Sequence, residues 1–276
     1  MSIHRIAFVI ALLLCCTAVS GSPSESQNVP VRWQKLGHDL EIAEVHTSPG
    51  TLLSPQLTLL RTSGTSYQLG VVAAVSFGMQ RSTVKRLAES SGAMLGINAN
   101  FFDERGDPLG LVLTGGRLRH AVHRGGKTLT GVLEVRRGGA RIVSRDRFSP
   151  KGVLEAIQAG PRLIVGSAPV EKPRDSVKYE RRAGVCIDRQ GRIVFFISSG
   201  LIGISFKELI QLLLQSDVGC RDALNLDGGG SAQLYLSSEI AGAVPTLREL
   251  SVPGSDQIPV MLALMVKRRA GASSAP

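Results

Sequence analysis

The chain has 276 residues and carries 32 lysines and arginines against 22 aspartates and glutamates, a formal net charge of +10. This length suits one large or two small domains, and the positive charge favours anionic partners. Nucleic acid is not an expected partner, because the most basic stretch, residues 117–151, holds a single aromatic side chain, Phe148, whereas single-strand binders interleave several aromatics with their charges.

The first 20 residues have the pattern of a bacterial signal peptide. Arg5 precedes an apolar stretch over residues 6–16, and Ala18-Val19-Ser20 matches the small-x-small pattern of a signal-peptidase site. A lipoprotein is the alternative, but a lipidated cysteine normally follows a small residue, and here Leu14 or Cys15 precedes. The apolar stretch is shorter than the about 20 residues that span a membrane. We predict cleavage after residue 20, export to the periplasm or beyond, and a mature chain without a transmembrane segment.

Short strand-like stretches outnumber helical patterns in the rest of the chain. The predicted strands are 40–47, 57–62, 70–77, 131–137, 140–145, 183–198 (a hairpin) and 258–268. One helix over about 82–91 ends at Gly92, and a second starts at Ser205, which forms a capping box with Glu208. This order predicts an α+β fold, in which a mixed, largely antiparallel β-sheet is covered by a few helices in a single domain.

Cys186 and Cys220 are the two cysteines of the predicted mature chain. In an exported protein they can form a disulfide, which in the entropic model stabilises the fold by roughly 3–4 kcal/mol. Two buried free thiols are an equal alternative, so the sequence leaves their state open.

Four stretches carry polar side chains that simple strands and loops do not need. They contain Asn98 and Asn100; Gln158, Gly160 and Arg162; Arg181 and Arg182; and the run Asn225-Leu226-Asp227-Gly228-Gly229-Gly230-Ser231. The two asparagines of the first stretch alternate, so they face one side of a strand. Three glycines after one acid indicate a tight turn or a close backbone approach. Each stretch alone also has a structural interpretation, as turn or strand-edge residues.

Motifs of other functional classes are missing. Gly126-Lys127-Thr128 mimics the end of a phosphate-binding P-loop, but Ala121 stands where that loop needs its first glycine. Ser231 lacks the second glycine of a nucleophile elbow, so we expect a hydrogen-bonding or turn-stabilising hydroxyl there. We find no His-Glu-x-x-His and no cysteine–histidine cluster at metal spacing, and we therefore expect neither a metal nor a cofactor.

The polar residues of the four stretches together suit an anionic sugar. Arginine binds phosphate in a bidentate manner, N–H groups exposed in a glycine turn form an anion site, and amides both donate to and accept from sugar hydroxyls. The expected partner is thus an anionic sugar phosphate or an envelope glycan.

In these stretches, and in this order, the chain resembles the phosphodiester glycosidase family from about Leu95 to the C-terminus. The matching residues are Gly96-Ile97-Asn98-Ala99-Asn100-Phe101-Phe102, Gln158-Ala159-Gly160-Pro161-Arg162-Leu163, Arg181-Arg182-Ala183 and Asn225-Leu226-Asp227-Gly228-Gly229-Gly230-Ser231. The family usually has Asn-Gly-Gly where this chain has Asn98-Ala99-Asn100, and a small hydroxyl residue in place of Arg182. Together with the predicted signal peptide (1–20), this resemblance divides the chain into an N-terminal β-rich part of the domain (21–94) and a phosphodiester glycosidase-like catalytic region (95–276).

The resemblance implies an exported hydrolase that cleaves the glycosidic bond of a sugar-1-phosphodiester, of the N-acetylhexosamine-1-phosphodiester type, and releases free sugar and a phosphomonoester. It implies Asp227 as the catalytic carboxylate, either nucleophile or general base, and Arg181 as the phosphate clamp. A two-carboxylate glycosidase needs a partner acid, and Asp103 is the candidate, although an acid of a surface turn is the better interpretation of this residue. The implied substrate-binding residues are Asn98, Asn100, Gln158, Gly160, Arg162 (also the second phosphate clamp), Asn225, Gly228, Gly229, Gly230 and Ser231.

Two other classes stay open at this point. A phosphodiesterase would break the P–O bond, usually with metals held by clustered aspartates and histidines. A non-catalytic binder of anionic envelope glycans would keep the arginines and amides but would not depend on Asp227.

Overall fold

The computed structural model describes residues 29–37, 39–47, 54–170, 177–200, 202–242 and 250–267. The predicted signal peptide lies outside these ranges. A search of the described residues finds no helix that is long and apolar enough to cross a membrane.

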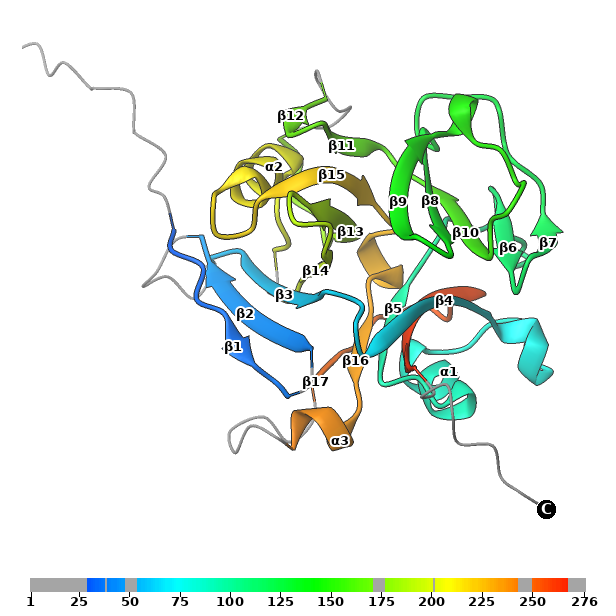
Figure 1. Ribbon diagram of the computed structural model, residues 1–276, viewed down its shortest axis with the longest axis horizontal. Coiled ribbons are helices and arrows are strands. Elements are labelled where there is room, and N and C mark those ends of the chain that lie inside the picture. Colours follow the sequence, from blue (N-terminus) through cyan, green and yellow to red (C-terminus); the bar gives the residue numbers. More distant parts are fainter. Residues whose placement is uncertain are drawn as a thin grey trace, which may run out of the picture.

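The strands form three sheets, in which every pairing between the described strands is antiparallel (Figure 1). The first sheet has the order β1 (Gln34–Lys35), β2 (Leu40–His46), β3 (Gln56–Thr62), β14 (Ile193–Ser198), β13 (Ala183–Asp188), β15 (Cys220–Asn225), β11 (Arg162–Val165), β12 (Ala168–Pro169). The second has the order β7 (Arg117–His120), β6 (Val112–Thr114), β10 (Glu155–Ala159), β8 (Gly131–Arg136), β9 (Gly139–Ser144). The third has the order β17 (Leu250–Val252), β16 (Leu234–Leu236), β5 (Leu95–Asn98), β18 (Val260–Val266), β4 (Tyr67–Ala73). The expected α+β fold with largely antiparallel strands is confirmed.

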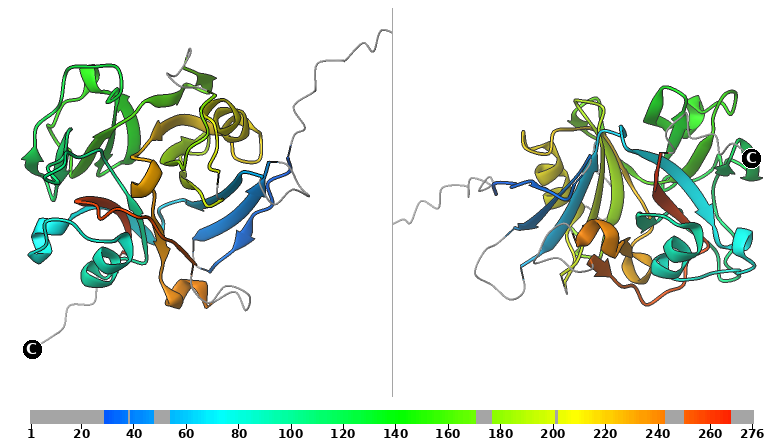
Figure 2. Two further views of the ribbon diagram at one scale, coloured as in Figure 1. Left: turned by 180° about the vertical axis from the view of Figure 1, so that it is seen from behind. Right: turned by 60° about the horizontal axis from the view of Figure 1, so that its bottom comes forward.

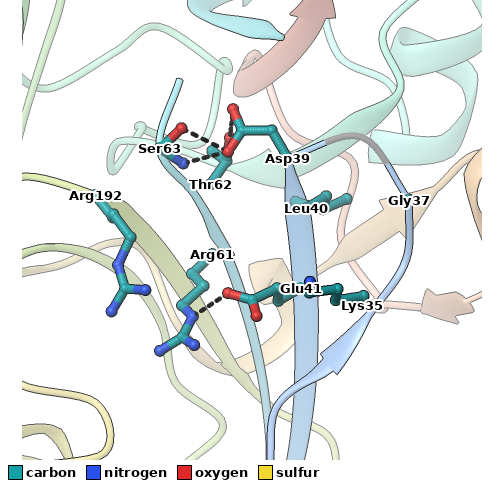
Figure 3. A pocket seen from close by; sticks show the side chains of 9 residues that line it. All are labelled: Lys35, Gly37, Asp39, Leu40, Glu41, Arg61, Thr62, Ser63 and Arg192. Atoms are coloured by element: carbon teal, nitrogen blue, oxygen red, sulfur yellow. Dashed lines mark hydrogen bonds and ion pairs between the residues drawn. The ribbon is translucent and has the colours of Figure 1, made fainter. Parts of the chain in front are cut away.

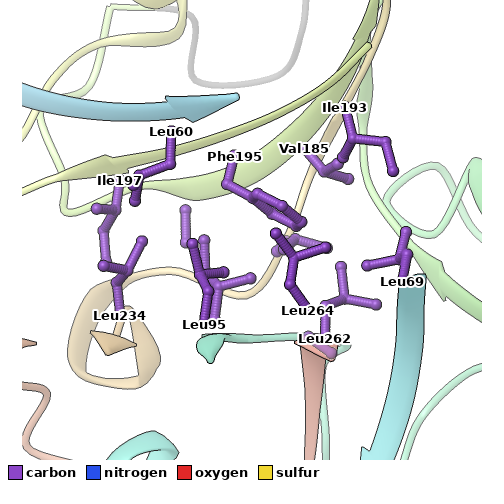
Figure 4. Close-up of a cluster of buried hydrophobic side chains, with 14 of the residues drawn as sticks. Leu60, Leu69, Leu95, Val185, Ile193, Phe195, Ile197, Leu234, Leu262 and Leu264 are labelled. Atoms are coloured by element: carbon purple, nitrogen blue, oxygen red, sulfur yellow. The ribbon is translucent and has the colours of Figure 1, made fainter. Parts of the chain in front are cut away.

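One hydrophobic core lies where the three sheets face one another. Phe195 of the first sheet meets Leu95 and Leu262 of the third (Figure 4), and Leu133 of the second belongs to the same cluster. Strands from before and after residue 95 share these sheets, since β3 pairs with β14 and β4 pairs with β18. The N-terminal part of the chain therefore completes the fold of the later part.

Two helices cover the outer faces of two sheets (Figure 2). The helix α1 (Val84–Ser91) packs on the third sheet and ends at Gly92, as the sequence predicts. The helix α2 (Phe206–Leu214) packs on the first sheet and begins with the predicted capping box of Ser205 and Glu208. The remaining helical segments are η1 (Ala74–Phe77), η2 (Arg145–Arg147), η3 (Gly229–Ser231) and α3 (Ser238–Ala241).

The predicted strand 70–77 is wrong at its C-terminal end. β4 stops at Ala73, and residues 74–77 form the helical turn η1. Ala74 N–H makes a last bond to Pro259 O at 2.8 Å, after which the chain turns at Gly78, whose φ is 71°. Val75 and Phe77 of this turn are exposed, so their apolar character alone was misleading here.

Cys186 and Cys220 form a disulfide between the neighbouring strands β13 and β15, with their Cα atoms 5.9 Å apart. The structure thus resolves the alternative that the sequence left open. Both cysteines are fully buried between the first sheet and α2.

Several charges of the basic stretch 117–151 have structural partners. The carboxylate of Glu134, which is 1% exposed, forms ion pairs with Arg136 and Arg141. Arg145 donates to the backbone carbonyls of Gly126 and Leu129. Several arginines of this stretch therefore form ion pairs and hydrogen bonds within the second sheet and its loops.

Gly184 generates a test of how closely β13 packs beside the end of β15. A Cβ at this position would collide with the ring of buried Phe196 and would lie 2.7 Å from Leu224 O. We expect Gly184→Ala to lower the free energy of unfolding by about 3 kcal/mol, the upper end for overpacked cores. The matched control is Gly138→Ala, where a Cβ would meet nothing within 4 Å. Equal unfolding midpoints in urea for the two variants would contradict this packing.

Candidate active site

Asp227 lies where three strand ends meet. β15 ends at Asn225, and the next residue, Leu226, donates its N–H to Ala183 O at the start of β13 (2.9 Å). Asp227 N–H then donates to Ala99 O, just beyond β5 (3.0 Å). Backbone hydrogen bonds of Leu226 and Asp227 thus connect the first sheet to the third.

Asn98 fixes the other side of the Asp227 backbone. Its fully buried amide donates from Nδ2 to Asp227 O at 2.7 Å and accepts from Gln233 N–H at 3.0 Å. Because both the oxygen and the nitrogen of this amide are engaged inside the protein, Asn98 acts as a positioning residue. The predicted contact of Asn98 with a sugar is therefore not supported.

Two of the three glycines of the turn, Gly228 and Gly230, lie in close contact with neighbouring residues. A Cβ on Gly228 would lie 2.7 Å from Arg181 O, and a Cβ on Gly230 would lie 2.5 Å from Asp256 Oδ2. Gly229 has a φ of 57°, the left-handed region that glycine enters without steric cost. A side chain at Gly228 would therefore push the Arg181 backbone away, and one at Gly230 would displace the side chains of Ser255 and Asp256, whereas at Gly229 space is open and only the backbone conformation favours glycine.

Two of the glycine N–H groups hold the turn itself. Gly228 N–H donates to Asp227 Oδ1 at 3.0 Å, and Gly229 N–H donates to Arg181 O at 2.9 Å. The sequence-based expectation of an anion site made from these N–H groups is therefore wrong for Gly228 and Gly229.

The carboxyl group of Asp227 titrates near neutrality. Burial raises its pKa from 3.8 to about 6, hydrogen bonds from Ser231 and Gly228 N–H oppose this rise, and the negative charge of Asp256 adds to it. A group with a pKa close to the working pH can take up and release protons, which suits general acid–base chemistry.

Asp256 is a second carboxylate at the site, and the sequence analysis missed it. It is exposed in the loop between β17 and β18, and its N–H donates to Gly230 O at 3.2 Å. Its Oδ2 accepts from Ser231 Oγ at 3.4 Å, and the same hydroxyl, which has a single hydrogen to donate, lies near enough to Asp227 to lower the pKa of that carboxyl group. One serine hydroxyl thus faces both carboxylates, as the expected hydrogen-bonding role of Ser231 requires. No local motif marks Asp256, because only the return of the chain along β18 brings it here.

Asp103, the partner acid considered from the sequence, is held in its own surface turn. Its Oδ1 accepts from Asp107 N–H at 2.9 Å, and its Oδ2 lies 3.3 Å from Arg105 Nη2. These contacts, the Asp107 N–H first, hold the pKa of Asp103 below its ordinary value. The surface-turn interpretation of Asp103 therefore holds.

Arg181 lies against the glycine turn and ties it to the loop of Asp256. Its Nη2 donates to Ala232 O and Pro253 O at 2.8 and 2.7 Å. Its Nε and Nη1 have no hydrogen-bond partner among the described residues, and the side chain is partly exposed. Arg182 is the buried member of the arginine pair, with its guanidinium carbon 3.8 Å from the centre of the Phe206 ring.

Two asparagines beside Asp227 keep polar atoms without partners. Asn100 is 2% exposed, and neither Oδ1 nor Nδ2 of its amide has a partner within the described part of the chain. Asn225 is 3% exposed and donates from Nδ2 to Gly160 O and Leu226 O, whereas its Oδ1 has no such partner. A buried polar group without a partner costs about 1–3 kcal/mol. Unpaired amides next to a titratable acid therefore indicate a surface that a polar ligand completes.

Gln158 has a structural role in place of the predicted sugar contact. Its fully buried amide accepts from the N–H groups of Leu111 and His123 and donates to the carbonyls of His123 and Leu129. All of its hydrogen-bonding capacity is thus used to hold the loop between β7 and β8. Gly160 serves the site indirectly, because its carbonyl orients Asn225.

Arg162 lies on the opposite face of the first sheet from Asn225. It is paired with Leu224 in β15, and residues directly opposite in a sheet share a face, whereas consecutive residues alternate. Its side chain lines a cavity of about 510 Å³ together with Arg147 and Asp222. The structure therefore does not bring Arg162 to the candidate site as a second phosphate clamp.

Another cavity, of about 390 Å³, lies on the first sheet, and several of its charged side chains have partners (Figure 3). Arg61 Nε lies 2.6 Å from Glu41 Oε2, and Asp39 accepts from both the hydroxyl and the N–H of Ser63. None of the residues placed around Asp227 lines this cavity. In the part of the chain that the structure describes, no group of three metal-ligating side chains is found.

Comparisons with known proteins place the site within a known family of sequences. The model of the phosphodiester glycosidase family matches residues 91–267. N-acetylglucosamine-1-phosphodiester alpha-N-acetylglucosaminidase of Bos taurus is 31% identical over 191 residues, which cover 59% of this chain and 34% of that protein. The enzyme of the same name from Mus musculus is 28% identical over 187 residues, covering 59% and 35%. The chain thus spans about a third of the length of these curated relatives.

Solved structures support the fold. The zebrafish N-acetylglucosamine-1-phosphodiester alpha-N-acetylglucosaminidase catalytic domain, auto-inhibited by its pro-peptide, matches with a TM-score of 0.62 at 18% identity, over 89% of this chain and 95% of that one. A hypothetical protein from Synechocystis matches with a TM-score of 0.57 at 18% identity, over 86% and 64%. At these identities the likeness concerns the fold.

The raised pKa of Asp227 generates a test that needs no substrate. A carboxyl group with a higher pKa in the folded than in the unfolded chain binds protons more tightly when folded, so stability falls as pH rises from about 4 through 6. A pKa that is raised by about two units lowers the free energy of unfolding at high pH by up to about 3 kcal/mol. Asp227→Asn removes this penalty. We expect the melting temperature of the variant to exceed that of the wild type at pH 7.5 and to match it near pH 4.

Asp103→Asn is the control with the opposite sign, because the pKa of Asp103 is lowered. Loss of the Asp103 carboxylate should reduce the melting temperature at pH 7.5. The difference in melting temperature from the wild type should shrink as the pH falls through the ordinary pKa range of aspartate. If Asp227 only caps its turn, Asp227→Asn will behave like Asp103→Asn.

Proposed function

Because the chain belongs to the phosphodiester glycosidase family, we propose that it hydrolyses the glycosidic bond of a sugar-1-phosphodiester, releasing free sugar and a phosphomonoester. The observation that carries this proposal is the placement of Asp227, a largely buried carboxyl group with a pKa of about 6, beside a second carboxylate. An N-acetylhexosamine-1-phosphodiester is the substrate type, by analogy with the names of the relatives.

Two neighbouring carboxylates suit glycosidic cleavage. Ser231 Oγ lies 3.4 Å from Asp256 Oδ2 and lowers the pKa of Asp227, and the negative charge of Asp256 raises that pKa, so Asp227 and Asp256 are neighbours. Retaining glycosidases have their carboxylates about 5 Å apart and inverting ones further, at about 6.5–9.5 Å. Asp227 acts in its ionised form, either by attacking the anomeric carbon or by taking a proton from the attacking water. Asp256 is the partner carboxylate in either case.

The leaving group needs charge stabilisation more than protonation. When the bond between the anomeric carbon and oxygen breaks, its electron pair passes to the phosphate, and the water supplies OH to the sugar and H⁺ to the base. Nε and Nη1 of Arg181 are available to the developing negative charge on the phosphate. Preorganised donors of this kind stabilise charge that appears in the transition state.

Export is part of the proposed function. The sequence pattern of residues 1–20 and the buried disulfide between Cys186 and Cys220 both suit an oxidising compartment outside the cytoplasm. In this proposal the region 21–94 completes the sheets and the region 95–276 carries the site.

Hydrolysis in ¹⁸O-labelled water tests the bond that breaks. With an N-acetylglucosamine-1-phosphodiester as substrate, glycosidic cleavage leaves the phosphomonoester unlabelled. Asp227→Asn should lower kcat by roughly 10³-fold, because the amide keeps the shape of the acid but cannot act as base or nucleophile.

The rival classes predict other results in the same experiment. Label in the phosphate, together with activity lost to EDTA and restored by a divalent cation, would establish a phosphodiesterase. Binding of sugar phosphates without products from any phosphodiester would establish a non-catalytic glycan binder.

The pH dependence of kcat/KM tests the roles of Asp256 and Ser231. The acid limb should lie near pH 6, where Asp227 ionises in the free enzyme. Asp256→Asn removes a negative charge that disfavours ionisation of Asp227, so the limb should move to lower pH. Ser231→Ala removes a hydrogen bond to the ionised form, so the limb should move to higher pH. A fall in rate with an unmoved limb in both variants would assign these residues a structural role only.

A further inference from the structure

The most informative feature left unexplained by the proposed reaction is the pair of amides with unpaired atoms, Asn100 and Asn225, which we call the amide pair. They are 2% and 3% exposed. Asn100 has both amide atoms without partners among the described residues, and Asn225 has its Oδ1 in the same state. The fully engaged amides of Asn98 and Gln158 show that this fold pairs its buried amides where no ligand is needed.

The amide pair lies directly beside the reacting acid. Asn225 is two positions before Asp227, and the Ala99 carbonyl that precedes Asn100 accepts the Asp227 N–H at 3.0 Å. Gly160 O holds Nδ2 of Asn225 at 3.0 Å, which leaves Oδ1 as the atom that Asn225 presents. Two acceptor oxygens and one donor nitrogen thus have no partner within the described part of the chain, on residues that adjoin Asp227 through the backbone.

This set of atoms distinguishes the two ends of a sugar phosphodiester. A phosphodiester oxygen can only accept hydrogen bonds, so it would leave two carbonyl oxygens unpaired and repelled by its negative charge. A sugar hydroxyl both donates and accepts, so hydroxyls can satisfy all three atoms. Arg181 offers the opposite chemistry, because it carries donors only.

We propose that the amide pair binds the hydroxyls of the sugar ring and thereby orients the substrate, with the ring over Asn100 and Asn225 and the phosphate towards Arg181. This inference rests on the proposed function and names the part of the substrate that each side of the site recognises. Asn100 is the specificity-determining residue of the pair. Its Oδ1 and Nδ2 accept from one hydroxyl and donate to an adjacent one, as a vicinal pair of ring hydroxyls offers.

The acetamido group is not what Asn100 recognises with both atoms. In a trans amide the N–H and the C=O point in opposite directions, so one planar side-chain amide cannot contact both. Asn100 therefore selects sugars by their ring hydroxyls. An N-acetyl group of the substrate is bound by other residues of the site.

Binding of the two product halves tests the orientation. N-acetylglucosamine and methyl phosphate are titrated separately into wild type, Asn100→Ala and Arg181→Gln, and dissociation constants are measured by NMR. Asn100→Ala should weaken the sugar about tenfold, as expected for two lost hydrogen bonds, and should change the methyl phosphate constant less than twofold. Arg181→Gln should show the reverse pattern, and Arg181→Lys replaces it if the melting temperature shows that the glutamine variant does not fold.

A deoxy series then tests the vicinal hydroxyls. The 3-deoxy and 4-deoxy analogues of N-acetylglucosamine should bind wild type more weakly than the parent sugar, and at least one of these losses should vanish in Asn100→Ala. Losses that persist unchanged in the variant would overturn the assignment of Asn100.

The outcomes separate this inference from the proposed reaction. Weaker methyl phosphate binding in Asn100→Ala would reverse the orientation and overturn the inference, whatever the activity. Sugar binding that depends on Asn100 without hydrolysis of any phosphodiester would support the inference and refute the reaction. A wild type that binds no sugar would refute both.

Discussion

Two buried amides hold the candidate site together. Asn98 donates to the carbonyl of Asp227 and accepts from Gln233 N–H, and the Gln233 side chain donates to the carbonyl of Asp256 at 2.6 Å. Gln233 Oε1 also accepts from Val84 N–H in the first turn of α1. Both carboxylates are thus tied, through backbone carbonyls, to the same rigid junction of β5, β16 and α1. The fold therefore fixes the backbone positions of both acids.

The junction also explains why the site is energetically unfavourable in the absence of a ligand. Burial of Asp227 raises its pKa, and the unpaired atoms of Asn100 and Asn225 each cost about 1–3 kcal/mol. The surrounding core of three sheets, with Phe195 and Leu262 fully buried, offsets these penalties. Such unfavourable terms persist only where the surrounding structure holds the backbone firmly in place.

Local patterns in the sequence predicted the elements whose causes are local. The capping box at Ser205, the helix stop at Gly92 and the hairpin of β13 and β14 depend on residues within a few positions of each other. The strand end at Ala73 was missed, because the partner that sets it, Pro259, is distant in the sequence.

The same limit applies to the residues proposed for the site. Asp227 is marked by the glycines that follow it, whereas Asp256 arrives on a distant loop with no motif of its own. Sequence cannot distinguish an amide that faces a ligand from one that holds a loop. For this reason Asn98 and Gln158 were grouped with Asn100 and Asn225, although only the latter two keep unpaired atoms. Arg162 was misplaced for a different reason, since its face of the sheet is set by its pairing with Leu224.

The role of the glycine run follows from these contacts. The run packs against the Arg181 carbonyl on one side and the Asp256 carboxylate on the other, and a Cβ at Gly230 would displace Asp256 from Ser231. Gly254 completes this packing, because a Cβ there would meet Gly230 O. An anion site would need N–H groups that point outward, yet those of Gly228 and Gly229 point into the turn. The run from Asp227 to Ser231 therefore brings the serine hydroxyl and Asp256 next to Asp227, and it uses the N–H groups of Gly228 and Gly229 within the turn.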